Sequence, residues 1–156
     1  MKFLVLWLVA SSLYAKPAPL FHADVLGGGK LSLAENLKPG RGTLVSFWAT
    51  WCSPCMEELK HLAKVLGKDS KIPIDVITVN VDTSETSSDV RSTARLEKIL
   101  FPIALDPTHR IFGKYNAEKA LPYSVLLNGQ GTILKSFQGY QPDMVEQMQA
   151  ALRVAN

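Results

Sequence analysis

The chain is poor in cysteine, carries no block of like charge and has no hydrophobic run long enough to cross a membrane. It has two cysteines, whereas a closed zinc site needs about four ligands, and its three histidines are scattered. The formal charge is +3 at pH 7, and basic and acidic residues alternate, so nucleic acid is not an indicated partner. With 47% hydrophobic residues, the composition is that of one globular domain.

The first fifteen residues form a separate segment. Lys2 supplies a positive start, residues 3–10 are apolar, and Ala15 is a small residue suited to cleavage. We predict a signal peptide over residues 1–15, cleaved or retained as an anchor, and one domain over residues 16–156. The apolar stretch is well short of the roughly 20 residues that cross a bilayer. Export would place the cysteines in the periplasm or another extracytoplasmic compartment, where a working dithiol needs an electron source.

Strand-like and helix-like segments alternate along the remaining chain. We predict strands over residues 21–26, 30–33, 43–49, 74–82, 101–105, 123–127 and 132–137. We predict helices over residues 55–66, from the loop after residue 82 to about residue 100, over 108–115, and from Pro142 onward. The run 43–49 is almost entirely apolar, which is typical of a strand buried on both faces. This alternation predicts an α/β fold with helices on both faces of the sheet.

Both cysteines lie in the stretch "FWATWCSPCMEEL", between a buried strand and a helix. At that junction the free N–H groups and the helix dipole favour a thiolate on Cys52. Cys55 lies one turn further on, where it can attack a mixed disulfide formed by Cys52. Pro54 fits the first turn of the helix and stiffens the loop, and Trp51 offers an apolar surface to a partner. These residues indicate reversible thiol–disulfide exchange.

Two other uses of the cysteine pair stay open at this point. A structural disulfide is one, although a bridge that closes so short a loop removes little entropy from the unfolded chain. Copper is the other, because soft thiolates select Cu(I), and the protein would then be an assembly factor whose thiols carry metal.

The segments "FWATWCSPC" and "LPYSVLLNGQGTIL", in a chain with an export signal, resemble the thioredoxin superfamily, nearest its TlpA/ResA-like branch. The resemblance covers essentially all of residues 16–156. It implies a three-layer α/β/α sandwich around a mixed central sheet. It also implies an amino-terminal β-hairpin and a central strand–helix insertion between residues 74 and 100.

The resemblance also implies roles for residues outside the cysteine motif. It predicts a cis peptide bond between Leu121 and Pro122, where the Leu121 backbone could pair with an extended substrate segment. It aligns Glu58 with an acidic residue that could move the proton of Cys55 or tune the thiol pKa values. The buried Asp and the Lys of thioredoxin itself are replaced by Ser46 and Thr78, so the chain does not resemble the general cytosolic reductant.

Together these patterns predict an extracytoplasmic protein thiol–disulfide oxidoreductase that needs no cofactor beyond its own cysteine pair. We expect a monomer that reduces disulfides of client proteins and is itself reduced by a membrane thiol donor. The resemblance suggests clients in cytochrome c maturation or in copper-site and oxidase assembly. A disulfide-donating oxidase or isomerase uses the same chemistry in reverse, because the reduction potential and the regenerating partner set the direction.

Overall fold

The computed structural model describes residues 16–155, so the signal peptide predicted over residues 1–15 lies outside the described part. Seven strands form one sheet in the order β2-β1-β5-β4-β3-β6-β7. The strands are β1 (His22–Val25), β2 (Lys30–Ser32), β3 (Gly42–Trp48), β4 (Ile74–Asn80), β5 (Ile103–Leu105), β6 (Tyr123–Leu127) and β7 (Ile133–Gln138). The helices are α1 (Leu33–Asn36), α2 (Ser53–Leu66), α3 (Val90–Leu96), α4 (Phe112–Tyr115) and α5 (Met144–Ala155), with a 3₁₀ turn at Ser87–Asp89.

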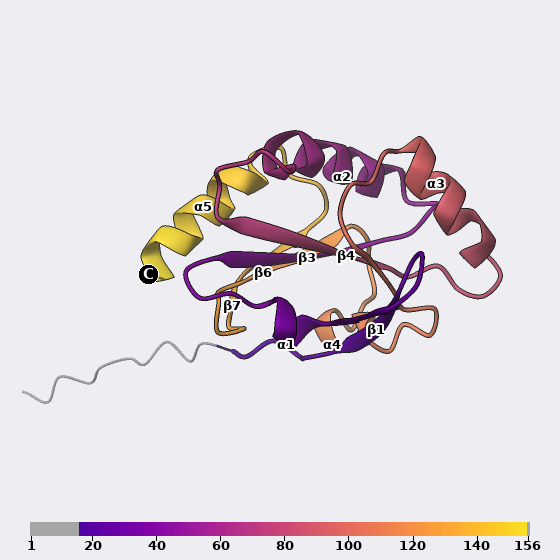
Figure 1. The fold of residues 1–156 in the computed structure, drawn as a ribbon, viewed down its shortest axis with the longest axis horizontal. Helices are drawn as coiled ribbons and strands as arrows, with labels where there is room; N and C mark the ends of the chain where they lie inside the picture. Colours follow the sequence, from indigo (N-terminus) through magenta and orange to yellow (C-terminus); the bar gives the residue numbers. More distant parts are fainter. Residues whose placement is uncertain (1–15, 156) are drawn as a thin grey trace, which may run out of the picture.

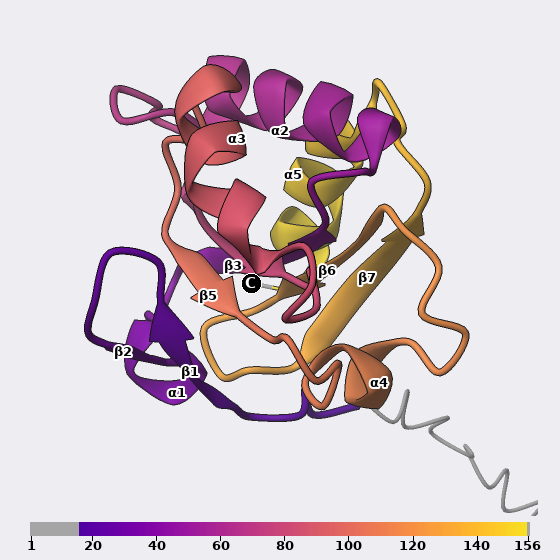
Figure 2. The same ribbon diagram turned by 90° about the vertical axis from the view of Figure 1, so that its right-hand side faces the viewer.

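The sheet is mixed, as expected. Strands β3, β4 and β5 run parallel, whereas β6 and β7 join the β3 side antiparallel. On the other side, β1 and β2 form the predicted amino-terminal hairpin, and β1 pairs antiparallel with β5. Helices α2, α3 and α5 cover one face of the sheet, and the short helices α1 and α4 lie on the other, which gives three layers (Figures 1 and 2).

The central elements follow from the hydrophobic pattern. All seven residues of β3 are buried, because β4 and β6 flank it and helices cover both of its faces. Helix α2 buries Cys55, Leu59, Leu62 and Leu66, which recur at helical spacing, and it ends at Leu66, before Gly67. The cysteine motif therefore lies between the most buried strand and the helix packed on it.

Several boundaries differ from those predicted. The helix expected to reach about residue 100 ends at Leu96, and Lys98 has a φ of 52°. Strand β5 begins only at Ile103, because Pro102 has no N–H to contribute to the ladder. Helix α4 begins at Phe112, where the Asp106 carboxylate accepts the N–H groups of Ile111 and Phe112. The short helix α1 was not predicted.

Among the described residues 16–155, no helix is both long enough and apolar enough to cross a membrane.

Candidate redox site

Cys52 and Cys55 form a disulfide at the amino end of α2, with an S–S distance of 1.99 Å. Cys52 is the residue that caps the helix, and its carbonyl oxygen accepts the N–H groups of Cys55 and Met56. Cys52 is 4% exposed and Cys55 only 1%, so Cys52 is the more accessible of the pair. The backbone thus holds Cys52 where the positive end of the helix dipole would stabilise a thiolate.

The predicted substrate-contacting residues lie around this end of the sheet. Trp51 is 65% exposed, and Pro54 is exposed in the first turn of α2. The peptide bond between Leu121 and Pro122 is cis, which confirms the expectation from the resemblance. Strand β6 begins directly after Pro122, with Tyr123 opposite Phe47 near the end of β3. Pro122 therefore lies at the same end of the sheet as the disulfide.

Glu58 is a buried carboxyl group beneath the cysteine motif. It lies one turn after Cys55 on the inward face of α2 and is 1% exposed. The hydroxyl groups of Ser46 and Ser124 both donate to its Oε1 atom, at 3.0 and 2.5 Å. Its Oε2 atom is buried and has no hydrogen-bond partner in the described structure. Oε1 is therefore the hydrogen-bonded oxygen of this carboxyl group, and Oε2 is the oxygen without a partner among the described residues.

The surroundings of Glu58 favour its protonated form. Burial raises the pKa of Glu58, and the hydrogen bonds from Ser124 and Ser46 offset only part of that effect. A carboxyl group with a raised pKa is a stronger base when ionised and a proton donor over more of the pH range. The site thus combines a disulfide at a helix terminus with a nearby group that can hold a proton.

Asp82 anchors the loop that leads into the cysteine motif. Its carboxylate accepts the Thr50 N–H at 2.8 Å, the Thr50 hydroxyl at 2.6 Å and the Asn80 amide at 2.7 Å. Burial alone would raise the pKa of Asp82, but these hydrogen bonds outweigh it and hold the pKa below its ordinary value. An ionised Asp82 therefore fixes the backbone immediately before Trp51 and Cys52.

Three residues of this arrangement were not assigned a role from the sequence. In the sequence, Ser46 is marked only by its difference from thioredoxin, and no local pattern indicates a role for Ser124 or Asp82. The strand pairing shows why these residues belong to the site. Ser124 lies directly opposite Ser46 on the neighbouring strand, and Asp82 lies near Thr50 because β3 and β4 end at the same edge of the sheet. Among residues 16–155, no group of three or more His, Cys, Asp or Glu side chains is arranged to hold a metal ion.

Comparisons with known proteins fit this arrangement. The sequence profile of the AhpC/TSA family matches residues 14–148. The chain belongs to the AhpC/TSA family. Thiol-disulfide oxidoreductase ResA of Bacillus cereus (strain ZK / E33L) is 32% identical over 126 residues, which cover 81% of this chain and 70% of that protein. The ResA protein of Bacillus anthracis is 31% identical over 138 residues, covering 88% and 76%.

A solved structure of StoA from Bacillus subtilis has the same fold as this AhpC/TSA family member. The two superpose with a TM-score of 0.67 at 27% identity, over 86% of this chain and 98% of StoA. The family and these relatives make the chain a thioredoxin-like thiol–disulfide oxidoreductase of the ResA type.

Proposed function

We propose that this oxidoreductase works outside the cytoplasm as a reductase of client protein disulfides. The observation that carries the proposal is the Cys52–Cys55 disulfide at a helix amino terminus, with the buried Glu58 carboxyl group one turn further on. A disulfide that has only a structural role needs no buried carboxyl group nearby to accept or donate a proton. The export signal predicted over residues 1–15 supports the location.

The proposed reaction starts from the reduced protein. The Cys52 thiolate attacks one sulfur of a client disulfide, and the other client sulfur leaves as a thiolate, so a mixed disulfide forms. The Cys55 thiolate then attacks the Cys52 sulfur, which releases the reduced client and regenerates the Cys52–Cys55 disulfide. Two electrons pass to the client in each cycle. A membrane thiol donor returns them by the same exchange in reverse.

Each of the other candidate residues has a role in this scheme. Glu58 accepts the proton that Cys55 must lose before it can attack, a task for which its raised pKa makes the carboxylate a better base. The exposed Trp51 presents an apolar surface to the client, and Pro54 stiffens the turn between the sulfurs. The Leu121 backbone beside Pro122 pairs with an extended client segment as an added strand.

The resemblance to the TlpA/ResA-like branch suggests which clients to test first. These are apocytochrome c with its haem-binding cysteines, and the copper-site cysteines of respiratory oxidases. Both classes of client require reduced thiols in a compartment that oxidises them.

The experiment that tests the proposal is a trapping experiment with Cys55→Ala. Without Cys55 the mixed disulfide on Cys52 cannot resolve, so client adducts should accumulate on non-reducing gels and disappear after addition of dithiothreitol. The double variant Cys52→Ala/Cys55→Ala is the matched control and should give none. If Cys55→Ala forms no more adducts than the double variant, the exchange mechanism is wrong.

A further inference from the structure

Strand β4 has an outer edge that the sheet covers over only part of its length. On one side, β4 pairs with β3 from Ile74 to Asn80. On the other side, the short strand β5 pairs only with the segment from Thr78 to Asn80. The amino-terminal half of β4, residues 74–77, therefore has no neighbouring strand among the described residues.

The hydrogen bonds at both sides of β4 identify which residues face the open edge. Along a parallel strand, successive residues direct their N–H and C=O groups to opposite neighbours. The Gly42 N–H donates to the Pro73 carbonyl, so odd-numbered residues of this segment face β3. The Thr78 N–H donates to the Pro102 carbonyl, so even-numbered residues face β5. Val76 thus directs both of its main-chain groups to the open side.

These main-chain groups are unpaired within residues 16–155. The Ile74 N–H donates to the Ile72 carbonyl at 2.8 Å, but the Ile74 carbonyl and both groups of Val76 have no such partner. Continuing the ladder past Thr78 would require an N–H at position 102 to reach the Val76 carbonyl, and Pro102 has none. Pro102 therefore ends the strand pairing and leaves an edge that can accept another strand.

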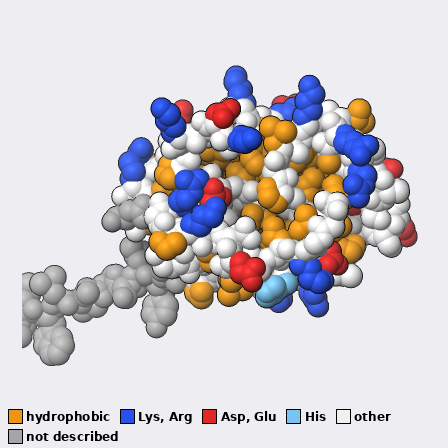
Figure 3. Space-filling view, viewed as in Figure 1, with side chains coloured by type: hydrophobic (Ala, Val, Ile, Leu, Met, Phe, Trp, Pro, Cys, Tyr) orange, Lys and Arg blue, Asp and Glu red, His pale blue; other side chains and the backbone are white. Residues whose placement is uncertain are grey.

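The open edge lies in a hollow whose lining is both apolar and polar. A cavity of about 440 Å³ is lined by β4 residues 74–77, by the segment 100–102 and by residues that follow α2. Leu100, at its border, is 69% exposed. A second hollow beneath α3 shares Leu100, Phe101 and Pro102 with the first. Figure 3 shows hydrophobic side chains gathered in the middle of this face, with Lys and Arg side chains around them.

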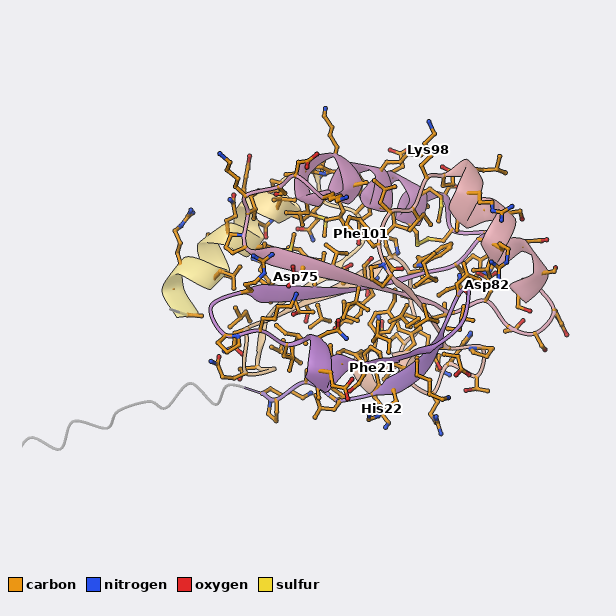
Figure 4. The ribbon with its side chains drawn as sticks, viewed as in Figure 1. Phe21, His22, Asp75, Asp82, Lys98 and Phe101 are labelled. Atoms are coloured by element: carbon orange, nitrogen blue, oxygen red, sulfur yellow. A yellow bond between two sulfur atoms is a disulfide. The ribbon has the colours of Figure 1, made fainter. Side chains whose placement is uncertain are left out.

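The rim of the two hollows is strongly basic. Six cationic side chains and a single carboxylate, that of Asp75, line them. The cations are Lys38, Arg41, Lys68, Arg91, Arg95 and Lys98. Asp75 pairs with Arg41 and Lys38 at 2.7 and 3.1 Å, which leaves the other four cations in excess. Figure 4 places Phe101 between Asp75 and Lys98 on this face.

We propose that the open edge of β4 is a docking site for an extended, acidic segment of a partner protein. The segment adds as a strand along residues 74–77, its main chain pairs with Val76, and its acidic side chains meet the basic rim. The free main-chain groups favour a peptide strand over a lipid surface, because headgroups do not form a strand ladder. The proposal is independent of the function proposed for the cysteine pair.

A partner bound there would leave the disulfide accessible. Cys52 follows the carboxyl end of β3, whereas Val76 lies opposite Leu44, towards the amino end of the parallel pair. At about 3.3 Å per residue, Val76 is roughly 13 Å from the Asn80 end of β4. Figure 4 shows Asp75 and Asp82 towards opposite ends of the sheet. The edge site could hold a partner while the cysteines react with it.

The test uses a blocked hexapeptide of alternating Glu and Val, which contains no cysteine, added to the isotope-labelled protein. We expect saturable amide shifts in residues 74–77 and 100–101 and slower hydrogen exchange at Val76, equally in the oxidised and reduced protein. The same peptide with every main-chain nitrogen methylated should not bind, because neither of its edges can then donate to the ladder. A peptide with Lys in place of Glu should bind at least about tenfold more weakly.

The variant Lys68→Glu/Lys98→Glu should weaken binding of the Glu–Val peptide about tenfold, whereas Lys114→Glu/Lys119→Glu, exposed elsewhere, should not. All of these lysines are exposed, so the fold should persist in both variants. Three results would overturn the proposal. The first is no saturable binding at millimolar peptide, and the second is binding of the fully N-methylated peptide. The third is slower hydrogen exchange at Val76 without any peptide, produced by higher protein concentration or by phosphatidylglycerol vesicles alone.

Discussion

Replacing Ser124 by Ala tests whether the cross-strand serine pair sets the proton affinity of Glu58. Ser124 and Ser46 donate to the same carboxylate oxygen, and Ser124 makes the shorter contact, 2.5 against 3.0 Å. The substitution removes one hydroxyl from a buried site and leaves the rest of β6 unchanged. Because the lost hydrogen bond stabilises the ionised carboxylate more than the protonated carboxyl group, the pKa of Glu58 should rise further above its ordinary value.

A hydrogen bond to a charged group contributes about 1.5–3 kcal/mol, and about 1.4 kcal/mol corresponds to a tenfold change in an equilibrium constant. Glu58 in the Ser124→Ala protein should therefore bind its proton roughly 10- to 100-fold more tightly than in the unmodified protein. Ser46→Ala should act in the same direction, because its hydroxyl donates to the same oxygen.

The assay is a carbon-13 NMR titration of labelled glutamate carboxyl groups in the oxidised protein, in which the cysteines do not titrate. Glu58→Gln assigns the signal. Ser136→Ala, an exposed serine of β7, is the matched control and should leave the titration midpoint unchanged. If the midpoint in Ser124→Ala equals or falls below that in Ser136→Ala, the Ser124 hydroxyl does not lower the pKa of Glu58.

Three further predictions follow from the same site. Asp82→Asn should destabilise the protein by about 1–3 kcal/mol at neutral pH, because the hydrogen bonds to the ionised carboxylate are weakened. The difference in unfolding free energy between the two proteins should shrink as the pH falls through the lowered pKa of Asp82. Urea unfolding measures this difference, and the exposed Asp69→Asn is the control. The unmodified protein should lose stability as the pH rises above about 4.5, because the Glu58 carboxyl group ionises less readily in the folded state than in the unfolded state. Gln does not ionise, so the unfolding free energy of Glu58→Gln, relative to that of the unmodified protein, should rise with pH above about 4.5. Trp51→Ala should change the unfolding free energy by less than about 0.5 kcal/mol yet slow disulfide exchange with clients in stopped-flow measurements; a normal exchange rate would contradict its contact role.

The elements that carry the site could be predicted because their signals are local. The apolar run of β3 and the helical spacing of Cys55, Leu59 and Leu62 each lie within one segment of chain. The strand 123–127 was predicted with the bounds that the structure shows. The cis bond before Pro122 came from the resemblance alone, because nothing in the local sequence distinguishes it from a trans bond.

The contacts that tune the site could not be predicted because they depend on pairing between distant strands. Ser124 meets Glu58 only because β6 lies antiparallel to β3 in the register that places it opposite Ser46. Asp82 reaches Thr50 only because β3 and β4 run parallel and end together. Neither contact can be predicted from the spacing of residues along the sequence.

The equilibrium reduction potential of the Cys52–Cys55 pair, measured at pH 7 in defined glutathione or dithiothreitol buffers, tests the proposed reductase role most directly. We predict a potential at or below about −220 mV, towards the thioredoxin end of the range, at which the dithiol passes electrons to client disulfides. A potential near about −120 mV would contradict it, because the disulfide would then be the reactive form and the protein would introduce bonds into its clients.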